Sequence, residues 1–588
     1  ARNSLGLAMI RFIVRSLAFF GFLVLAALGG GGYLAYQAFF AVPSLPEAVV
    51  LSIDLDQALA EQVDDDPVSG RLFGGDLSLR DVVNALDRGA HDSRVKGAVL
   101  RFGGDGLGMA QAQELRSAVS RFRAAGKFTT AYAESFGEFA PANKSYYLAS
   151  VCEQVWLQPV GMVGLTGLAA EMPFARKVLE QLHVVPEILH REEYKSAMET
   201  FTERTISGPH KEMLDSLLDD LTDQLVVGLS ATRKLDPLAV RRLIDRGPLL
   251  GREAREAGLI DRIGYFDEAT DEALERAGKG GAEAGLVTPE DYLEAAGEPN
   301  DSGPTVALIF AVGGIQRGDG GVNPMAGGDA VGSDSVVQAF QQAVDDEDVK
   351  AILFRIDSPG GSAVASESIR RAVMQARAAG KPVIVSMSDT AASGGYWIAM
   401  NADRIVAEPA TLTGSIGVIV GKMATAGFWD MLGVGWDGVK RGQNAGIWSD
   451  ISQYSPAERA RVEAVLDDIY ATFVRNVAEA RHLAPEKVRE IARGRVWTGH
   501  QALALGLVDE LGDLETALKR SREAIGLKAD EPVSLDVYPR PKSQIEKVVD
   551  LLSVSGTRLR QAVRAVAPVV SAVRGGESLR MPEVGLGR

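Results

Sequence analysis

The chain has little cysteine, little histidine and no excess of positive charge. Its one cysteine, Cys152, excludes an intrachain disulfide and any metal site built from several cysteines. The six histidines form neither a metal-ligand cluster nor a Ser–His–Asp pattern, and no glycine-rich phosphate loop is present. A formal net charge of -16 argues against nucleic acid as the main partner, because phosphate binding needs concentrated lysine and arginine. We therefore expect no metal, no cofactor and no nucleic acid.

Charge is also missing from one long stretch near the start of the chain. Residues 16–45 carry no charged side chain, and about 20 apolar residues suffice to cross a bilayer as a helix. Arginines precede this stretch, so the positive-inside rule places residues 1–15 in the cytoplasm. We expect a transmembrane anchor at residues 16–42, with everything after it translocated. A cleaved signal peptide is the competing interpretation, although its apolar region runs only about 7–15 residues.

What the chain does contain is an internal repeat. The sequence VKGAVLR at residues 95–101 returns as VKAILFR at 349–355, and AGK at 125–127 returns at the same offset of 254. Farther on the offset is 250, so that YYLA at 146–149 matches YWIA at 396–399. A chain of 588 residues is long enough to bury two cores. The repeat therefore predicts two domains with one fold.

Each copy alternates short apolar runs of strand length with amphipathic helical stretches. This alternation implies right-handed βαβ crossovers and mostly parallel sheets, an α/β fold. The expected strands are residues 49–53, 97–102 and 128–133 in the first copy and 305–310, 351–356 and 382–387 in the second. The expected domains are residues 47–277 for the first α/β repeat, 278–304 for a linker, 305–540 for the second α/β repeat and 541–588 for a helical tail.

Two motifs in the second copy can carry acyl-transfer chemistry. DSPGGS at residues 357–362 directly follows a buried-type strand, and its glycines allow backbone N–H groups to face a ligand. DTAASGGYW at 389–397 follows the next strand and opens a helix, which exposes the hydroxyl of Ser393 at the helix N-terminus. We expect Ser393 to be a nucleophile. The expected oxyanion donors are the amide of Gly394 and one amide from Gly360 or Gly361.

The base that we expect to activate Ser393 is a lysine in the first copy. Under the repeat, Ser393 falls opposite Asn143 and Lys195 falls opposite Ala445, so each copy keeps what the other lacks. Lys195 stands among aromatic and apolar neighbours, and burial depresses a lysine pKa towards neutrality. This division predicts one composite active site per pair of repeats. His190, shortly upstream of Lys195, is the alternative base.

These motifs resemble those of the signal peptide peptidase A (protease IV) family in its long, two-repeat bacterial form. Further shared motifs are YKS at residues 194–196 and TLTGSIG at 411–417. The resemblance implies a tandem fold akin to the Clp protease and crotonase superfamily, of the ββα superhelix type. It also implies a Ser/Lys dyad of Ser393 and Lys195, with Ser415 as a candidate for orienting the lysine amine.

The same resemblance implies a setting and a substrate. The expected enzyme is a homotetrameric, bowl-shaped serine endopeptidase, held in the bacterial inner membrane by its N-terminal helix. Its catalytic domains lie in the periplasm, and its substrates are cleaved signal peptides and similar apolar peptides.

Two other functions remain open on the sequence. A crotonase-type enzyme acting on acyl-CoA would share the fold and the oxyanion amides, but it would not need Ser393 as a nucleophile. A non-catalytic membrane scaffold would predict the loss of one member of the dyad, whereas both are present. The sequence also leaves open whether Lys195 meets Ser393 of its own chain or of a neighbour, although duplication within one polypeptide favours the same chain.

Overall fold

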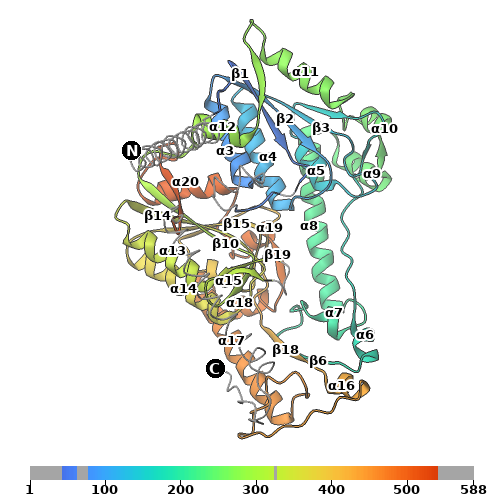
Figure 1. Cartoon of the computed structure of the whole chain (residues 1–588), viewed down its shortest axis with the longest axis vertical. Helices are drawn as coiled ribbons and strands as arrows, with labels where there is room; N and C mark the ends of the chain where they lie inside the picture. Colours follow the sequence, from blue (N-terminus) through green and yellow to red (C-terminus); the bar gives the residue numbers. More distant parts are fainter. Residues whose placement is uncertain (1–42, 58, 63–76, 324–327, 541–588) are drawn as a thin grey trace, which may run out of the picture. The chain divides into compact units, whose positions relative to one another are not determined.

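A computed structural model describes residues 43–57, 59–62, 77–323 and 328–540 of the chain (Figure 1). The predicted cytoplasmic segment (1–15), transmembrane anchor (16–42) and helical tail (541–588) lie outside the described residues. Among the helices within the described ranges, none combines the length and the apolar character needed to cross a membrane.

The first repeat is built on a six-stranded parallel sheet in the order β8-β4-β3-β2-β1-β9. Figure 1 labels β1, β2 and β3 of this sheet. Alternate residues of β1 enter different cores, because successive side chains of a strand point to opposite faces. Val49 and Leu51 pack in the main core, whereas Ala48 and Val50 pack against the helix α11 (Phe266–Ala277) on the other face. The strands are β1 (Ala48–Asp54), β2 (Val95–Phe102), β3 (Phe128–Ala133), β4 (Gln154–Leu157), β8 (Arg262–Ile263) and β9 (Ala284–Val287).

Helices cover both faces of this sheet, which explains why its central strands are apolar on both sides. A small antiparallel pair, β5 (Met162–Val163) with β7 (Leu249–Leu250), lies beside it. The helices of the first repeat are α3 (Leu79–His91), α4 (Met109–Ala124), α5 (Asn143–Ala149), α8 (Gly208–Arg233), α9 (Pro237–Arg246), α10 (Gly251–Glu256), α11 (Phe266–Ala277) and α12 (Pro289–Ala296).

The second repeat contains an eight-stranded sheet whose central path is β19-β17-β15-β14-β10-β21; β16 also pairs with β15, and β20 pairs with β16. All its pairings are parallel except that of β17 with β19. Its strands are β10 (Thr305–Val312), β14 (Val349–Ser358), β15 (Val383–Ala392), β16 (Arg404–Ala407), β17 (Leu412–Gly414), β19 (Val496–Thr498), β20 (Glu510–Leu511) and β21 (Ser534–Tyr538). The predicted α/β class with mostly parallel sheets is therefore confirmed.

The helices of the second repeat follow the same order as those of the first. A small sheet of β11 (Gly314–Gln316), β12 (Gly321–Asn323) and β13 (Gly328–Gly332) precedes the first of them. The helices are α13 (Ser333–Asp345), α14 (Ala363–Ala378), α15 (Gly394–Ala399), α17 (Pro456–Ala480), α18 (Pro485–Ile491), α19 (Gly499–Ala504) and α20 (Leu514–Ala524).

A strand pair and a buried ionic cluster are among the contacts that join the repeats. The first is an antiparallel pair of strands, β6 (Val185–His190) of the first repeat with β18 (Ile419–Ala424) of the second, flanked by α6 (Arg176–Gln181), α7 (Glu199–Thr202) and α16 (Ala426–Met431) (Figure 1). The second is a buried ionic cluster. Arg355 on β14 is 1% exposed and donates to Glu61 at 3.0 Å and to Glu114 at 2.7 Å. Separating the partners of such a buried ion pair would leave a charge buried without a partner, which is strongly destabilising. This cluster therefore favours one register between the repeats.

Residues 278–304, predicted as a linker, contain regular structure. Within them β9 pairs in parallel with β1, and α12 packs against α3. The composition alone did not indicate this, because a four-residue strand with a glycine carries little β-pattern. The segment thus completes one edge of the first sheet before the chain enters the second repeat.

Candidate active site

Ser393 lies at the junction between β15 and α15, as predicted. β15 ends at Ala392 and α15 begins at Gly394. The backbone of Ser393 adopts φ +55° and ψ −116°, a conformation that costs a side-chain-bearing residue about 1–3 kcal/mol. A hydrogen bond from its N–H to the carbonyl of Gly414, at 2.9 Å, holds this turn. The strained turn places the serine ahead of the first helical turn, where N–H groups have no intrahelical acceptor.

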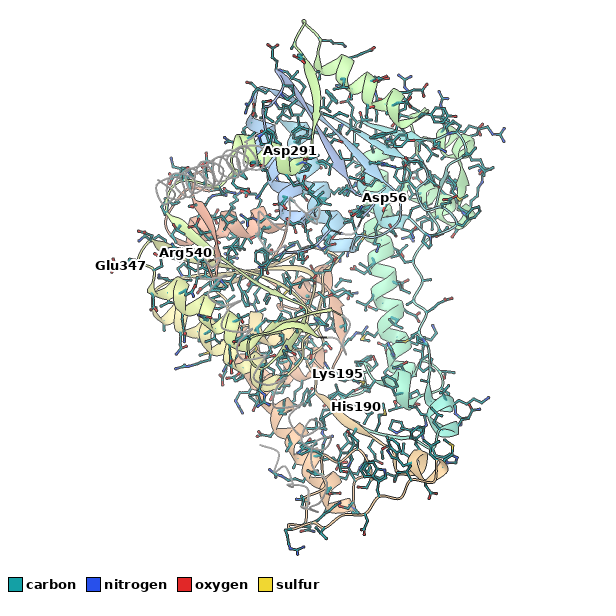
Figure 2. The ribbon with its side chains drawn as sticks, viewed as in Figure 1. Asp56, His190, Lys195, Asp291, Glu347 and Arg540 are labelled. Carbon is teal, nitrogen blue, oxygen red and sulfur yellow. The ribbon has the colours of Figure 1, made fainter. Side chains whose placement is uncertain are left out.

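Lys195 comes from the loop after β6 and is buried, with 6% of its surface exposed (Figure 2). Its Nζ lies 3.0 Å from Oγ of Ser393, 2.9 Å from Oγ of Ser415 and 2.9 Å from the carbonyl oxygen of Ser415. A neutral amine has two N–H donors and one lone pair. These three oxygens can therefore be satisfied by two donated hydrogen bonds to Ser415 and one accepted from the Ser393 hydroxyl.

Burial changes the protonation of this lysine. Removal of the ammonium from water lowers the pKa of Lys195 from 10.5 to about 8. A substantial fraction of the amine is then neutral at mildly alkaline pH. The group can accept a proton there, which an exposed lysine cannot do efficiently.

Backbone amides of the second repeat lie on the other side of Ser393. A Cβ placed on Gly360 would lie 2.5 Å from the nitrogen of Gly394 and 2.9 Å from Cβ of Ser393, so this position requires glycine. The N–H of Gly360 itself donates to Oγ of Ser358 at 3.2 Å. A Cβ on Gly394 would lie 3.0 Å from the nitrogen of Gly361. Of the two predicted glycines, Gly361 therefore has the amide that is better placed to act together with that of Gly394.

The corresponding helix N-terminus in the first repeat is occupied by side chains. Oδ1 of Asp105 accepts the N–H groups of Lys144 at 2.9 Å and of Ser145 at 2.8 Å. Oδ1 of Asn143 accepts the N–H of Gly167 at 3.0 Å, and Nδ2 of Asn143 donates to the carbonyl of Gly167 at 2.9 Å. By the offsets of the repeat, Asp105 stands where the second copy has Pro359, and Lys144 stands where it has Gly394. The first copy thus places its own carboxylate at the helix N-terminus that corresponds to the predicted oxyanion donor Gly394.

The alternative base, His190, has a different partner. It is exposed at the end of β6, and its Nδ1 lies 2.9 Å from the carbonyl oxygen of Glu192 (Figure 2). Both His190 and Lys195 line a cavity of about 330 Å³, but the hydrogen bond to Ser393 is made by Lys195. The structure therefore brings the predicted lysine to the predicted serine within one chain.

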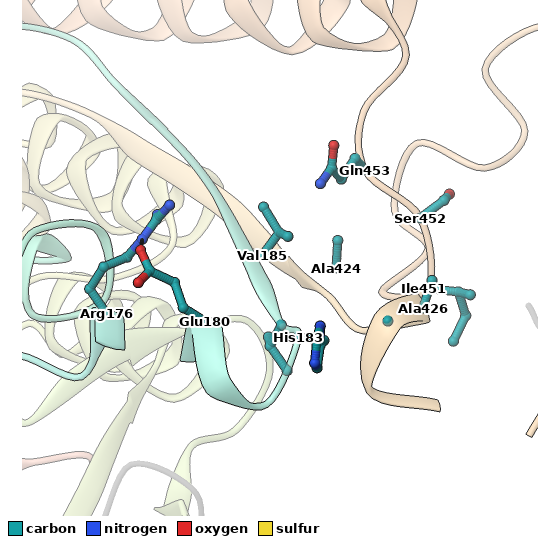
Figure 3. Close-up of a pocket in the computed structure, with 11 residues that line it drawn as sticks. Arg176, Glu180, His183, Val185, Ala424, Ala426, Ile451, Ser452 and Gln453 are labelled. Atoms are coloured by element: carbon teal, nitrogen blue, oxygen red, sulfur yellow. Dashed lines mark hydrogen bonds and ion pairs between the residues drawn. The ribbon is translucent and has the colours of Figure 1, made fainter. Parts of the chain in front are cut away.

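A larger cavity, of about 640 Å³, lies at the opposite end of the β6–β18 pair (Figure 3). Its walls include Arg176, His183 and Gln453, and none of the predicted site residues. Arg176 and Glu180 form an exposed ion pair at its edge. We assign no part of the acyl-transfer chemistry to it.

One group of residues near Lys195 escaped the sequence reasoning. Residues 493–495, just before β19, contact both the lysine loop and the loop of Ser415. The only signal for them is that an Ile-Xaa-Arg-Gly sequence occurs in both copies, at 244–247 and at 491–494. That signal marks a shared turn but does not reveal which distant residues the turn contacts.

Comparisons with known proteins find proteases similar to this chain. The model of peptidase family S49 matches residues 121–279 and 375–528. The chain is 34% identical to protease 4 of Salmonella typhi over 84% of this chain and 80% of that protein. It is 31% identical to the chloroplastic serine protease SPPA of Arabidopsis thaliana over 82% of this chain and 71% of that protein. A ClpP1 mutant from Listeria monocytogenes aligns with 37% of this chain and 94% of its own, at a TM-score of 0.23 and 15% identity.

Proposed function

Because the chain belongs to peptidase family S49 and is a serine protease, we propose that Ser393 is its nucleophile and Lys195 its general base. The observation that carries this proposal is the 3.0 Å separation of Lys195 Nζ and Ser393 Oγ, two residues far apart in the chain. Hydrogen-bond reach between nucleophile and base is the geometric requirement for activation. The depressed pKa of Lys195 supports the same assignment.

The mechanism begins with neutral Lys195, whose amine takes the proton of the Ser393 hydroxyl while Oγ attacks the carbonyl carbon of a peptide bond. The negative charge of the tetrahedral intermediate rests on the former carbonyl oxygen, between the N–H groups of Gly394 and Gly361. The resulting ammonium of Lys195 gives its proton to the leaving amine, which breaks the C–N bond. Water then attacks the acyl-enzyme, again with Lys195 as base, and Ser393 is released with its proton restored.

Ser415 has a positioning role in this mechanism. Its hydroxyl and carbonyl oxygens, each 2.9 Å from Nζ, hold the two amine hydrogens. The lone pair of the neutral amine is then directed at Ser393. Ser415 also adopts a positive φ of +49°.

We propose cleaved signal peptides and similar apolar peptides as substrates. The motif resemblance to the signal peptide peptidase A family and the similarity to a plant protease named SPPA support this substrate class. The uncharged stretch at residues 16–45 supports an anchor in a bacterial inner membrane, with the catalytic repeats on the periplasmic side. Such an anchor would hold the site close to peptides left in the bilayer. Assembly into a homotetramer and the assignment to the Clp and crotonase superfamily are part of the same proposal and rest on the resemblance.

The experiment that tests the dyad uses the full-length protein in detergent. Cleavage of a synthetic signal peptide and labelling by a fluorophosphonate are measured for the wild type, Lys195→Met and His190→Ala. We expect Lys195→Met to lose about 10³-fold or more in kcat and in the labelling rate. We expect His190→Ala to stay within about threefold of the wild type, because its ring bonds to a backbone carbonyl and not to Ser393.

The remaining outcomes separate the other functions. A folded Lys195→Met variant with wild-type activity would exclude the lysine base, and loss of activity in His190→Ala would point to the histidine. A wild type that cleaves no peptide but releases CoA from an acyl-CoA would favour the crotonase-type reaction. A wild type that does neither and is not labelled would favour the scaffold.

A further inference from the structure

Residues 493–495 of the second repeat lie between the loop of Lys195 and the loop of Ser415. They connect the end of α18 to β19. Each of the three residues makes one backbone hydrogen bond to one of these loops: Tyr194 N–H to the carbonyl of Arg493 at 3.1 Å, Gly494 N–H to the carbonyl of Ile416 at 2.9 Å, and Ser415 N–H to the carbonyl of Arg495 at 2.7 Å. The segment therefore ties the two loops that meet at the amine of Lys195.

Gly494 packs directly on the backbone of Lys195. A Cβ at this position would lie 2.6 Å from the backbone nitrogen of Lys195 and 2.8 Å from its Cβ, distances at which the lysine must shift. Gly494 also has a φ of +76°, which favours glycine independently of the contact. The absence of a side chain here sets how closely the lysine loop approaches the second repeat.

The aliphatic stem of Lys195 is confined from a second direction. A Cβ on Gly417 would lie 3.1 Å from Cδ of Lys195 and 2.9 Å from Cα of Gly494. The stem thus passes close to two glycine backbones on its way to Ser393. This confinement restricts the amine to the region where its three oxygen partners lie.

Arg495 anchors the segment to the first repeat. Its Nη1 donates to Oε1 of Glu212 on α8 at 2.8 Å, and the hydroxyl of Tyr194 donates to Oε2 of the same carboxylate at 3.0 Å. The guanidinium carbon also lies 5.0 Å from the ring centre of Tyr194 and 4.5 Å from that of Trp497. A planar guanidinium can make all these contacts at once, whereas an ammonium cannot. The residue next to Lys195 is thereby fixed by the same arginine.

The first repeat uses the equivalent turn differently. Its Ile-Xaa-Arg-Gly sequence ends at Gly247, followed by Pro248 where the second copy has Arg495. Gly247 has a φ of −57°, and a Cβ there would meet the carbonyl oxygen of Leu165 at 2.0 Å. The positive φ and the arginine are thus features of the copy that contacts the lysine.

We infer that residues 493–495 are a positioning element that sets the location of the Lys195 amine relative to Ser393 and Ser415. Gly494 determines how closely the loop of Lys195 approaches the second repeat. Arg495 fixes the orientation of that loop through its contacts with Tyr194. None of the three residues touches the reacting atoms, so their effect on catalysis passes through Lys195. This inference rests on the proposed role of Lys195 as base.

The test compares two glycine-to-alanine variants of the full-length protein in detergent. Gly494→Ala introduces a Cβ against Lys195, whereas Gly380→Ala, at φ +82°, introduces a Cβ with nothing within 4 Å. Both variants bear the same kind of backbone strain, and only the first displaces the lysine. We measure kcat, KM and the pH profile of kcat/KM for cleavage of a synthetic signal peptide, with thermal unfolding as the check on folding.

We expect Gly494→Ala to lose about 10²-fold in kcat, the effect of a displacement of about 1 Å in a catalytic group. Its KM should stay within about threefold, and its apparent pKa should move upwards because a displaced lysine is less buried. Gly380→Ala should match the wild type in all three quantities. A folded Gly494→Ala variant with the kinetics of Gly380→Ala would overturn the inference.

A second variant serves if Gly494→Ala does not fold. Arg495→Lys keeps the charge but loses the planar contact with Tyr194, and we expect about a tenfold loss in kcat with the same upward shift in apparent pKa. An unchanged profile in a folded Arg495→Lys variant would overturn the inference as well. Fluorophosphonate labelling of wild-type Ser393, abolished by Lys195→Met, separates the two proposals. If Ser393 is labelled in the wild type and not in Lys195→Met, while both positioning variants behave as the wild type, the proposed dyad is supported and the proposed positioning element is wrong.

Discussion

In each repeat a helix follows the third strand, α5 in the first and α15 in the second. The residues that surround the N-terminus of this helix differ between the two repeats. In the first repeat, Asn143 binds the backbone of Gly167 and Asp105 accepts the N–H groups at the start of α5. In the second repeat, Ser393 takes the position of Asn143 and Pro359 takes that of Asp105. Proline has no carboxylate with which to accept those N–H groups. The N-terminus of α15 therefore has no such side-chain acceptor, and the proposed base, Lys195, contacts Ser393.

This difference shows that two copies of one fold can take different roles within one chain. A carboxylate that accepts two backbone N–H groups satisfies orphan donors of the helix and stabilises it. The second copy gives up that contact and also adopts a strained backbone at Ser393. The first copy in turn contributes Lys195 from the loop after β6. At this helix N-terminus, the first copy thus keeps its N–H groups satisfied by a carboxylate, and the second copy has a strained backbone at its serine.

The largest expected effect comes from an exchange of serine between the copies. Ser393→Ala should lose about 10³-fold or more in kcat. Adding Asn143→Ser to that variant should restore nothing, because the second copy has Ala445 where the first has Lys195, and because Asp105 already accepts N–H groups at the start of α5. Peptide cleavage and fluorophosphonate labelling of both variants check this. Labelling at residue 143 of the double variant would show that the first copy can also form a site.

The next effect concerns the oxyanion amides. Gly360→Ala should lower kcat by about 10²- to 10³-fold, the loss typical of one missing oxyanion donor, because its Cβ would lie 2.5 Å from the nitrogen of Gly394. Gly126→Ala in the first repeat is the matched control, since Gly126 also has a positive φ, +85°, and a Cβ there has nothing within 4 Å. Steady-state kinetics with one peptide substrate compare the two. Equal kcat values in the folded variants would place the oxyanion donors elsewhere.

The pH dependence follows from the lysine. Protonated Lys195 cannot act as a base, and burial lowers its pKa to about 8. Below that pH, kcat/KM should fall about tenfold per pH unit, and above it the profile should level off. The measurement is kcat/KM against pH, with circular dichroism as a check that the protein stays folded. A midpoint near 6.5, the ordinary pKa of an imidazole, would instead indicate a histidine base.

Ser415 should have a smaller effect, because it touches the base and not the substrate. Ser415→Ala removes the hydroxyl at 2.9 Å from Nζ but leaves the backbone carbonyl at the same distance. With one of two orienting contacts retained, we expect about a tenfold loss in kcat, in line with one hydrogen bond of about 1–1.5 kcal/mol. By the offset of 250, Ser415 corresponds to Leu165 of the first repeat, and the next residue, Thr166, carries a hydroxyl. Thr166→Ala is therefore the control and should leave kcat unchanged. A loss in Ser415→Ala as large as in Lys195→Met would mean that the hydroxyl itself relays the proton.

Much of this arrangement could be predicted from the sequence, and the reason lies in local pattern. The strands that lead to Ser393 are short apolar runs, and the glycines that follow Ser358 and Ser393 are recognisable turn residues. The meeting of Lys195 and Ser393 came from the offset between the copies, which showed that each lacked what the other kept. The predicted strands at residues 97–102 and 128–133 are confirmed as β2 and β3.

What escaped prediction depends on contacts between distant segments. The pairing of β6 with β18 brings Lys195 to the second repeat, yet the sequence of neither strand predicts which strand it pairs with. The same holds for residues 493–495, whose carbonyls face two loops from different copies. The choice between the amides of Gly360 and Gly361 was also beyond the sequence, because it depends on one hydrogen bond to Ser358. Such features follow from tertiary packing and not from local propensity.

The smallest expected effect tests the strain at the serine turn. Ser393 has φ +55°, so Ser393→Gly should be more stable than Ser393→Ala by about 1 kcal/mol, although both are inactive. At Asn143, the first residue of the regular helix α5, the order should reverse, because glycine in a helix is about 0.5–1 kcal/mol worse than alanine. Thermal unfolding of the four variants measures both differences under one condition. If glycine were the less stable residue at both positions, the backbone of Ser393 would not be strained, and the contrast between the copies would lie in their side chains alone.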